Sequence, residues 1–237
     1  MLDFVELEAR IAADDRFPGA ARRLCETVLA FFADHPAAQR LLADQGQMRV
    51  ATACVALDPE IRLPDVVALV PAPIASPNRV AAALQLMRRE GALVPADRGL
   101  ASRRSGEPLG LSPAFAGLAR GWLRAMVEPA LLFADQPVAD IDCPLLYRRM
   151  CRSYLEATLL PTRSLKVSSS VERAQSRRGG ALLFLEVMRR ALGERDLPPF
   201  SKRAFAQRFG LSRTQVVGLV QDAASAGLLA DSGGLLA

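Results

Sequence analysis

Residues 201–229 of this 237-residue chain, SKRAFAQRFGLSRTQVVGLVQDAASAGLL, predict two short helices joined by a tight turn. Ser201 is placed to cap the first helix, because its hydroxyl can accept from free backbone N–H groups. Gly210 follows that helix where a left-handed backbone is needed, which costs least without a Cβ atom. Ser212 is expected to cap the second helix in the same way. The apolar residues of the first helix recur at helical spacing and are Ala204, Phe205 and Phe209.

The second predicted helix has an apolar face that we expect to be buried and a polar face that we expect to be open. Its inward residues are expected to be Val216, Leu219, Val220 and Ala223. Its outer residues are expected to be Arg213, Thr214, Gln215, Gly218 and Gln221. Because the helix begins with Arg-Thr-Gln, its first turn offers donors and acceptors suited to base edges and phosphates. Gly227 is expected to end the helix, and residues 228–236 predict a short hairpin.

A similar order of elements is predicted earlier in the chain. The elements are a helix over 63–70, a break over 71–75, a helix over 77–90, and strands over 92–95 and 100–104. The caps, apolar positions and terminating glycines have the same spacing in both segments, so one constant difference in residue number relates them. The clearest matches are Ser76, Val80 and Gly91 with Ser212, Val216 and Gly227. This correspondence indicates a repeated unit.

Helix, turn, helix and hairpin together resemble the winged helix-turn-helix family of DNA-binding proteins. The resemblance implies a mainly α protein with two winged units that carry short β-hairpin wings and are joined by a helical region. The predicted organisation is an N-terminal helical segment over 1–44, a first winged unit over 45–105, a helical linking or dimerisation region over 106–165, a basic serine-rich linker over 166–180, and a second winged unit over 181–237.

The resemblance also implies which residues contact double-stranded DNA. In the family, the second helix of the motif enters the major groove and the hairpin touches the DNA backbone or minor groove. For the first unit this implies Asn78, Arg79 and Gln85 in the groove and Arg98, Arg103 and Arg104 on the wing. For the second unit it implies Ser212, Arg213, Thr214, Gln215 and Gln221 in or beside the groove, and Lys202, Arg203 and Arg208 near phosphates.

Composition agrees with a polyanionic partner. The formal net charge is +5 and the isoelectric point is near 9.5. Charged residues interrupt the N-terminus, and the most apolar stretch, 122–139, contains charges and prolines. These features are not those of a signal peptide or a membrane span, so we expect a cytoplasmic protein with no membrane contact.

The sequence offers little for catalysis or metal binding. It contains no glycine-rich phosphate loop, no His-Glu-x-x-His and no Gly-x-Ser-x-Gly. Four cysteines, Cys25, Cys54, Cys143 and Cys151, lack the paired spacing of a zinc site, and His35 is the sole histidine. We therefore expect reduced, buried thiols, no metal, no cofactor and no enzymatic activity.

Helices predicted over 1–44 and 112–160 carry more apolar surface than two small winged units need, which favours a homodimer. The aromatic residues Phe115, Trp122, Tyr147 and Tyr154 are expected either to pack between helices or to form a ligand pocket or dimer seam. The effector, if there is one, is not identified by the sequence.

We therefore expect a transcriptional regulator that binds DNA through its winged units. One alternative is a plasmid-type replication initiator, which resembles this layout of two winged domains. A second alternative is a tandem winged-helix subunit of a chromosome-organising complex, in which the fold binds protein. Such subunits are usually acidic, whereas this chain is basic.

Overall fold

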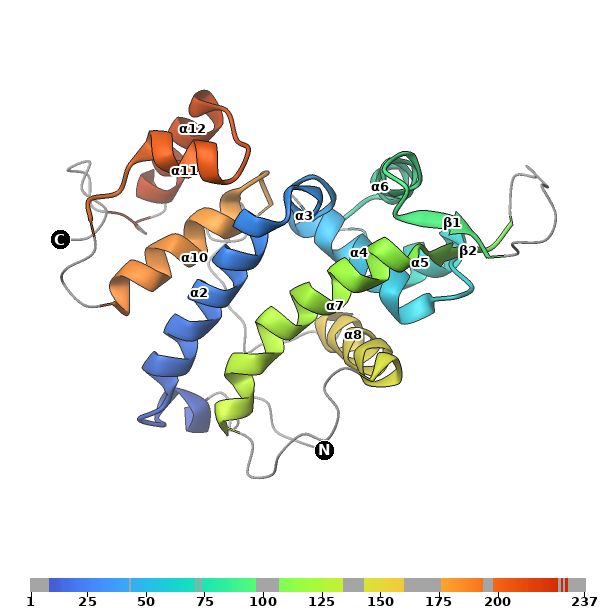
Figure 1. Cartoon of the computed structure of the whole chain (residues 1–237), viewed down its shortest axis with the longest axis horizontal. Helices are drawn as coiled ribbons and strands as arrows, with labels where there is room; N and C mark the ends of the chain where they lie inside the picture. The colour runs from blue at the N-terminus through green and yellow to red at the C-terminus, as the bar shows by residue number, and fades with distance from the viewer. Residues whose placement is uncertain are drawn as a thin grey trace. The chain divides into compact units, whose positions relative to one another are not determined.

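The computed structural model describes residues 9–42, 44–70, 72, 74–96, 107–133, 143–159, 176–193, 198–225, 227 and 229. Within these ranges the protein is mainly α-helical, as predicted, and contains one two-stranded antiparallel sheet (Figure 1). The elements are α2 (Phe17–Asp34), α3 (Pro36–Leu41), α4 (Gln45–Leu57), α5 (Leu63–Leu69), α6 (Pro77–Arg89), β1 (Leu93–Pro95), β2 (Leu109–Leu111), α7 (Pro113–Val127), the 3₁₀ helix η1 (Glu128–Phe133), α8 (Pro144–Leu159), α10 (Gly180–Ala191), α11 (Lys202–Arg208) and α12 (Arg213–Ser225).

The chain forms two compact units that alternate along the sequence. The terminal unit is built from residues 1–39, 124–139 and 162–237, and so contains α2, η1, α10, α11 and α12. The central unit is built from residues 40–123 and 140–161, and contains α4, α5, α6, the sheet and α8. The boundary falls within α7, after Leu123. The five segments predicted from the sequence remain predictions.

Helix α4 is the core of the central unit, where it packs against α8, α5 and α6. Asp44 caps its first turn by accepting a hydrogen bond from the Gln47 N–H at 3.0 Å. Every residue from Val50 to Val55 is buried. A helix with neighbours on all sides must be apolar or small all round, and the sequence VATACV meets that requirement. The hydroxyl of Thr52 donates to the Met48 carbonyl at 2.8 Å, so its burial leaves no donor unsatisfied.

The helix α6 has the boundaries and the buried face that the sequence predicts. Ser76 caps it by accepting from the Arg79 N–H at 3.4 Å, and Gly91 follows it with a φ of +70°. One face of the helix is buried, and its residues are Val80, Ala83, Leu84 and Met87. The short helix α5 begins with Pro64 in its first turn, where the missing N–H has no helical acceptor to lose.

The sheet contains a strand that the sequence analysis did not predict. Strand β1 pairs with β2, in the register Leu93 to Leu111 and Pro95 to Leu109. Two contacts from before α5 hold β2 in this place. The Leu111 N–H donates to Asp58 Oδ1 at 2.9 Å, and Leu109 forms an isolated β-bridge with Ile61. Residues 100–104 lie outside the described ranges, and β2 lies beyond the predicted end of the first unit at residue 105.

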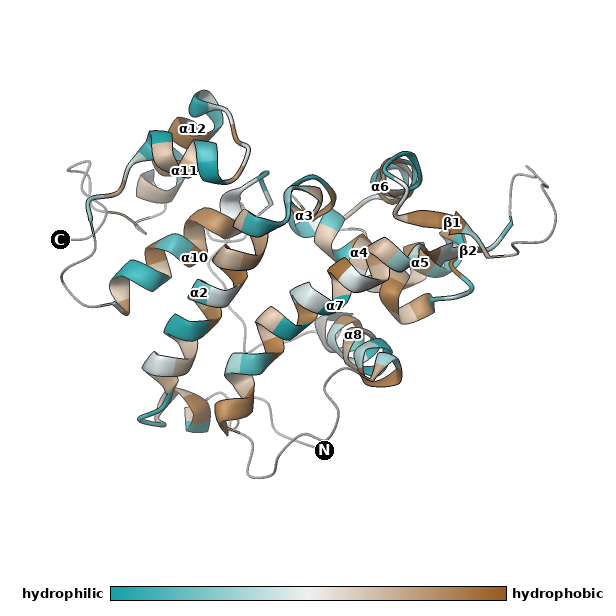
Figure 2. Cartoon of the chain, in the orientation of Figure 1, coloured by the Kyte–Doolittle hydropathy of each residue, from teal (hydrophilic) through white to brown (hydrophobic). Residues whose placement is uncertain are grey.

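In the terminal unit, α2 packs against α10 and η1. Figure 2 shows hydrophobic and hydrophilic residues alternating around α2 and α10, as expected for helices with one buried face. A buried carboxylate on α10, Glu186, accepts from Arg189 at 2.8 Å and from Arg190 at 2.7 Å. Arg190 also donates to the Pro198 carbonyl at 2.8 Å. This network fixes the start of the segment that leads into α11.

Two glycines test how tightly α10 and the turn before α12 are packed. Gly179, at the start of α10, has a φ of +82°, and a Cβ atom there would lie 2.6 Å from Leu211 Cδ1. Gly227 has a φ of +70°, but no described atom lies within 4 Å of its Cβ position. We expect Gly227→Ala to lower the free energy of unfolding by about 1–2 kcal/mol through backbone strain alone. We expect Gly179→Ala to cost about 0.5–1.5 kcal/mol more, because the end of the flexible Leu211 side chain must shift.

Urea unfolding followed by circular dichroism measures both variants. Equal losses for Gly179→Ala and Gly227→Ala would contradict the close packing of Leu211 against α10.

Candidate functional site

Helices α11 and α12 form the helix pair that the sequence predicts. Ser201 caps α11 by accepting from the Ala204 N–H at 3.2 Å. The chain then turns through only residues 209–212, and Gly210 adopts the predicted left-handed conformation with a φ of +60°. Phe209, which closes α11, is buried against Phe205 with ring centroids 4.8 Å apart. A connection of this length is typical of a helix-turn-helix.

The start of α12 is held by two reciprocal hydrogen bonds. The Gln215 N–H donates to Ser212 Oγ at 3.1 Å, and the Ser212 N–H donates to Gln215 Oε1 at 2.8 Å. This is a capping box, in which two free donors of the first turn are satisfied at once. Gln215 is half-buried, and its amide oxygen is already occupied. A base contact of the kind implied for Gln215 would therefore compete with the capping box for the same side chain.

The exposed side chains of the pair include four basic ones. Its four basic side chains, all exposed and none ion-paired with another described residue, are Lys202, Arg203, Arg208 and Arg213. One carboxylate occurs in residues 198–225, Asp222, and it pairs with Arg177. Thr214 and Gln221 are exposed, as predicted. The two short helices therefore carry four exposed basic side chains that pair with no described carboxylate.

Contacts from other parts of the terminal unit hold the turn, and no local sequence signal indicates them. The Gln39 side-chain amide donates to the Phe32 carbonyl at 2.7 Å and to the Arg208 carbonyl at 3.2 Å. Gln39 therefore links α3 to the last turn of α11. Gly218, expected on the outer face of α12, is half-buried because the Arg177 guanidinium lies 3.2 Å from its Cβ position.

The corresponding helix of the central unit, α6, presents a different surface. Asn78, Arg79 and Gln85 are exposed, as predicted. However, the Arg79 guanidinium pairs with Asp44 at 2.9 Å, so it is bound to the cap of α4. The connection from α5 to α6 spans residues 70–76 and is longer than the turn between α11 and α12. The three wing arginines that the sequence predicts, Arg98, Arg103 and Arg104, lie outside the described residues.

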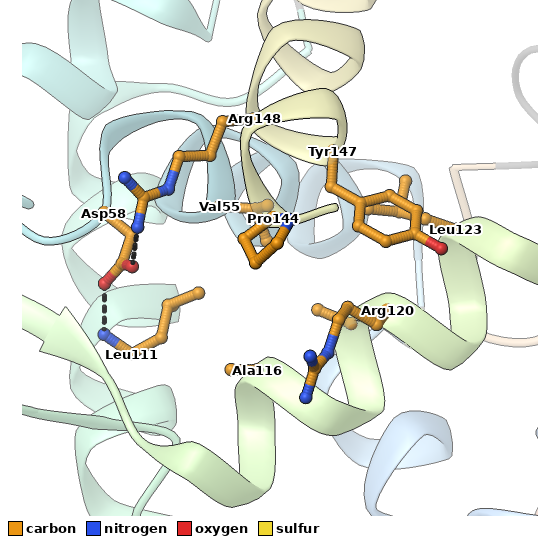
Figure 3. A pocket seen from close by; sticks show the side chains of 10 residues that line it. Val55, Asp58, Leu111, Ala116, Arg120, Leu123, Pro144, Tyr147 and Arg148 are labelled. Carbon is orange, nitrogen blue, oxygen red and sulfur yellow. Dashed lines mark hydrogen bonds and ion pairs between the residues drawn. The ribbon is translucent and has the colours of Figure 1, made fainter. Parts of the chain in front are cut away.

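The central unit also contains a cavity of about 250 Å³ (Figure 3). It lies between the end of α4, strand β2, α7 and α8. Tyr147, one of the aromatic residues singled out in the sequence, lines it. The others lie elsewhere: Phe115 and Trp122 are buried, and the exposed Tyr154 ring carries the Arg49 guanidinium 4.4 Å from its centroid.

No protein-family model, curated protein or solved structure matches this chain. Among the described helices, none is long and apolar enough to cross a membrane. In the same part of the chain, no group of three or more His, Cys, Asp or Glu side chains is placed to hold a metal ion. The candidate functional sites are therefore the exposed basic side chains of α11 and α12 and the cavity of the central unit.

The reactivity of the cysteines tests whether the cores of the two units are packed as described. Cys25, Cys54 and Cys151 are buried, whereas Cys143 is half-buried before α8. Burial raises the pKa of Cys25 to about 11 and that of Cys151 to about 12, and it also raises the pKa of Cys54. These three thiols are protonated at pH 8 and closed to reagents, so we expect only Cys143 to react quickly with a disulfide reagent.

The absorbance of the thiolate that the reagent releases counts the reactive cysteines. The chain unfolded in guanidinium should give all four thiols. Cys143→Ser should remove the fast phase. More than one fast thiol in the native protein would contradict the buried positions.

Proposed function

We propose that this protein is a DNA-binding transcriptional regulator whose main reading element is the pair α11 and α12. The observation that carries the proposal is the cationic surface of that pair, where four basic side chains face solvent and the one carboxylate is paired. Phosphates attract such a surface strongly because neutralising them releases condensed counterions. Helix α12 would lie in the major groove, with Arg213 and Thr214 on its first turn.

The order of elements supports winged-helix units. In the central unit α4, α5 and α6 are followed by the antiparallel strands β1 and β2, and Ile61, between α4 and α5, bridges to β2. In a winged helix, three helices are likewise followed by a hairpin. In the terminal unit α10, α11 and α12 follow one another in the same way. The second hairpin, predicted over 228–236, falls almost wholly outside the described residues.

Arg213 is the residue to test first. Wild-type protein would select a bound sequence from random genomic fragments, and fluorescence anisotropy would then measure affinity for it across a salt series. We expect Arg213→Ala to weaken specific binding by about 5- to 150-fold, the effect of about 1–3 kcal/mol per lost base contact. Lys202→Ala should reduce the slope of log K against log [salt] by about 1, because one phosphate contact is lost.

The matched control is Arg149→Ala, since Arg149 is an exposed arginine on α8 in the central unit. It should leave affinity unchanged. Gln215 is unsuitable for this test because its substitution would also remove the capping box. If folded Arg213→Ala and Lys202→Ala bind DNA like wild type, α12 does not contact the bases. The next helix to test for base contacts is then α6, with Asn78. No DNA binding at low salt would favour a protein-binding module.

The proposal includes a homodimer in the cytoplasm, since two-fold symmetry would let each chain read one half-site. Exposed apolar side chains on α8 support it, with Leu145 64% exposed and Tyr154 46% exposed. We expect light scattering to give the dimer mass at tens of micromolar, a typical range for modest interfaces. Leu145→Asp should shift the mass toward the monomer, whereas Leu63→Asp on α5 should not. A monomeric wild-type protein would contradict this part of the proposal.

A further inference from the structure

The cavity of the central unit has mostly apolar walls and a charged rim. Val55, Leu123 and Pro144 contribute apolar surface, and the Tyr147 ring forms part of the wall. Figure 3 shows the Tyr147 and Pro144 rings beside the space, with Arg120 projecting from α7 on its other side. Pockets that bind small molecules combine such apolar walls with a few polar groups that fix orientation.

The walls are held in place by one carboxylate. Asp58 Oδ1 accepts from the Leu111 N–H at 2.9 Å, and Asp58 Oδ2 pairs with Arg148 at 2.9 Å. Asp58 follows α4, Leu111 ends β2, and Arg148 lies on α8, so a single side chain joins three of the four elements around the cavity. The cavity is therefore preformed in the central unit.

Among the described residues, the charges at the rim do not cancel. The carboxylate of Asp58 compensates Arg148, since the two form an ion pair. Arg120, by contrast, is exposed at the rim and forms no ion pair or hydrogen bond with another described side chain. The guanidinium of Arg120 is therefore a positive charge beside an apolar space, and no carboxylate in the described ranges pairs with it. A guanidinium in this position is suited to a carboxylate, which it can bind with two parallel hydrogen bonds.

We propose that this cavity binds a small monocarboxylic acid with an apolar body, such as an aromatic or branched aliphatic acid. The carboxylate accepts hydrogen bonds from Arg120, and the body lies against Leu123, Pro144 and Tyr147. The size agrees, because 250 Å³ equals the volume of about eight liquid waters, close to one ring with a carboxyl group. The cavity belongs wholly to the central unit, so this proposal is independent of DNA binding by α11 and α12.

Three small ligands of similar shape but different charge test whether binding depends on the carboxylate. Isothermal titration of the full chain should show one benzoate bound per chain, much weaker binding of benzyl alcohol, and no binding of benzylammonium. Arg120→Gln should weaken benzoate at least about tenfold while changing benzyl alcohol by less than about twofold, since only the charged contact is lost. Arg149→Gln, an exposed arginine outside the cavity, should change neither.

A second variant tests the location of the site independently of charge. Ala116 lines the cavity from α7 and is half-buried, so Ala116→Leu places extra atoms in it. We expect this variant to lose both benzoate and benzyl alcohol, with circular dichroism and melting temperature showing that it is folded.

Each remaining outcome overturns the proposal. Benzoate binding that survives Arg120→Gln would remove the role of the guanidinium. Equal affinity for all three probes would remove the preference for a carboxylate. Failure of wild-type protein to bind benzoate at tens of millimolar, beyond the weak range expected for a ligand of this size, would remove the site itself.

Discussion

The four-residue turn between α11 and α12 is the constraint on which the proposed DNA-binding surface depends. Gly210 supplies a positive φ, Phe209 is buried beneath the turn, and the capping box of Ser212 and Gln215 starts the next helix. Because none of these interactions uses Arg213 or Thr214, both side chains stay exposed at the positive end of a helix. The turn thus separates the residues that build the fold from those that are free to bind.

In the central unit, Asp58 has a comparable organising role. It accepts from the backbone of β2 and pairs with Arg148 of α8. These two contacts hold β2 at 109–111 and join it, through Asp58, to α8 at the cavity. One carboxylate at the end of a helix therefore positions both the sheet and the proposed ligand site.

Local features could be predicted from the sequence, and long-range contacts could not. The caps at Ser76 and Ser212 and the left-handed glycines follow from side-chain chemistry within one turn, and the structure has them as predicted. The partner of β1 was missed because its position depends on Asp58 and Ile61, which are far away in sequence. The capping role of Gln215 was not predicted, although the spacing Ser-x-x-Gln is itself the sequence signature of a capping box.

The ion pair between Arg79 and Asp44 distinguishes α6 from α12 in a way that their matching sequences hide. A phosphate that approached Arg79 would have to replace a carboxylate already 2.9 Å from the guanidinium, and that carboxylate also caps α4. Phosphate binding by Arg79 would still release cations condensed on DNA, but it would also break the ion pair with Asp44, so the net gain in free energy would be smaller. Helix α6 therefore already binds an anion of its own chain, whereas Arg213 of α12 pairs with no described residue.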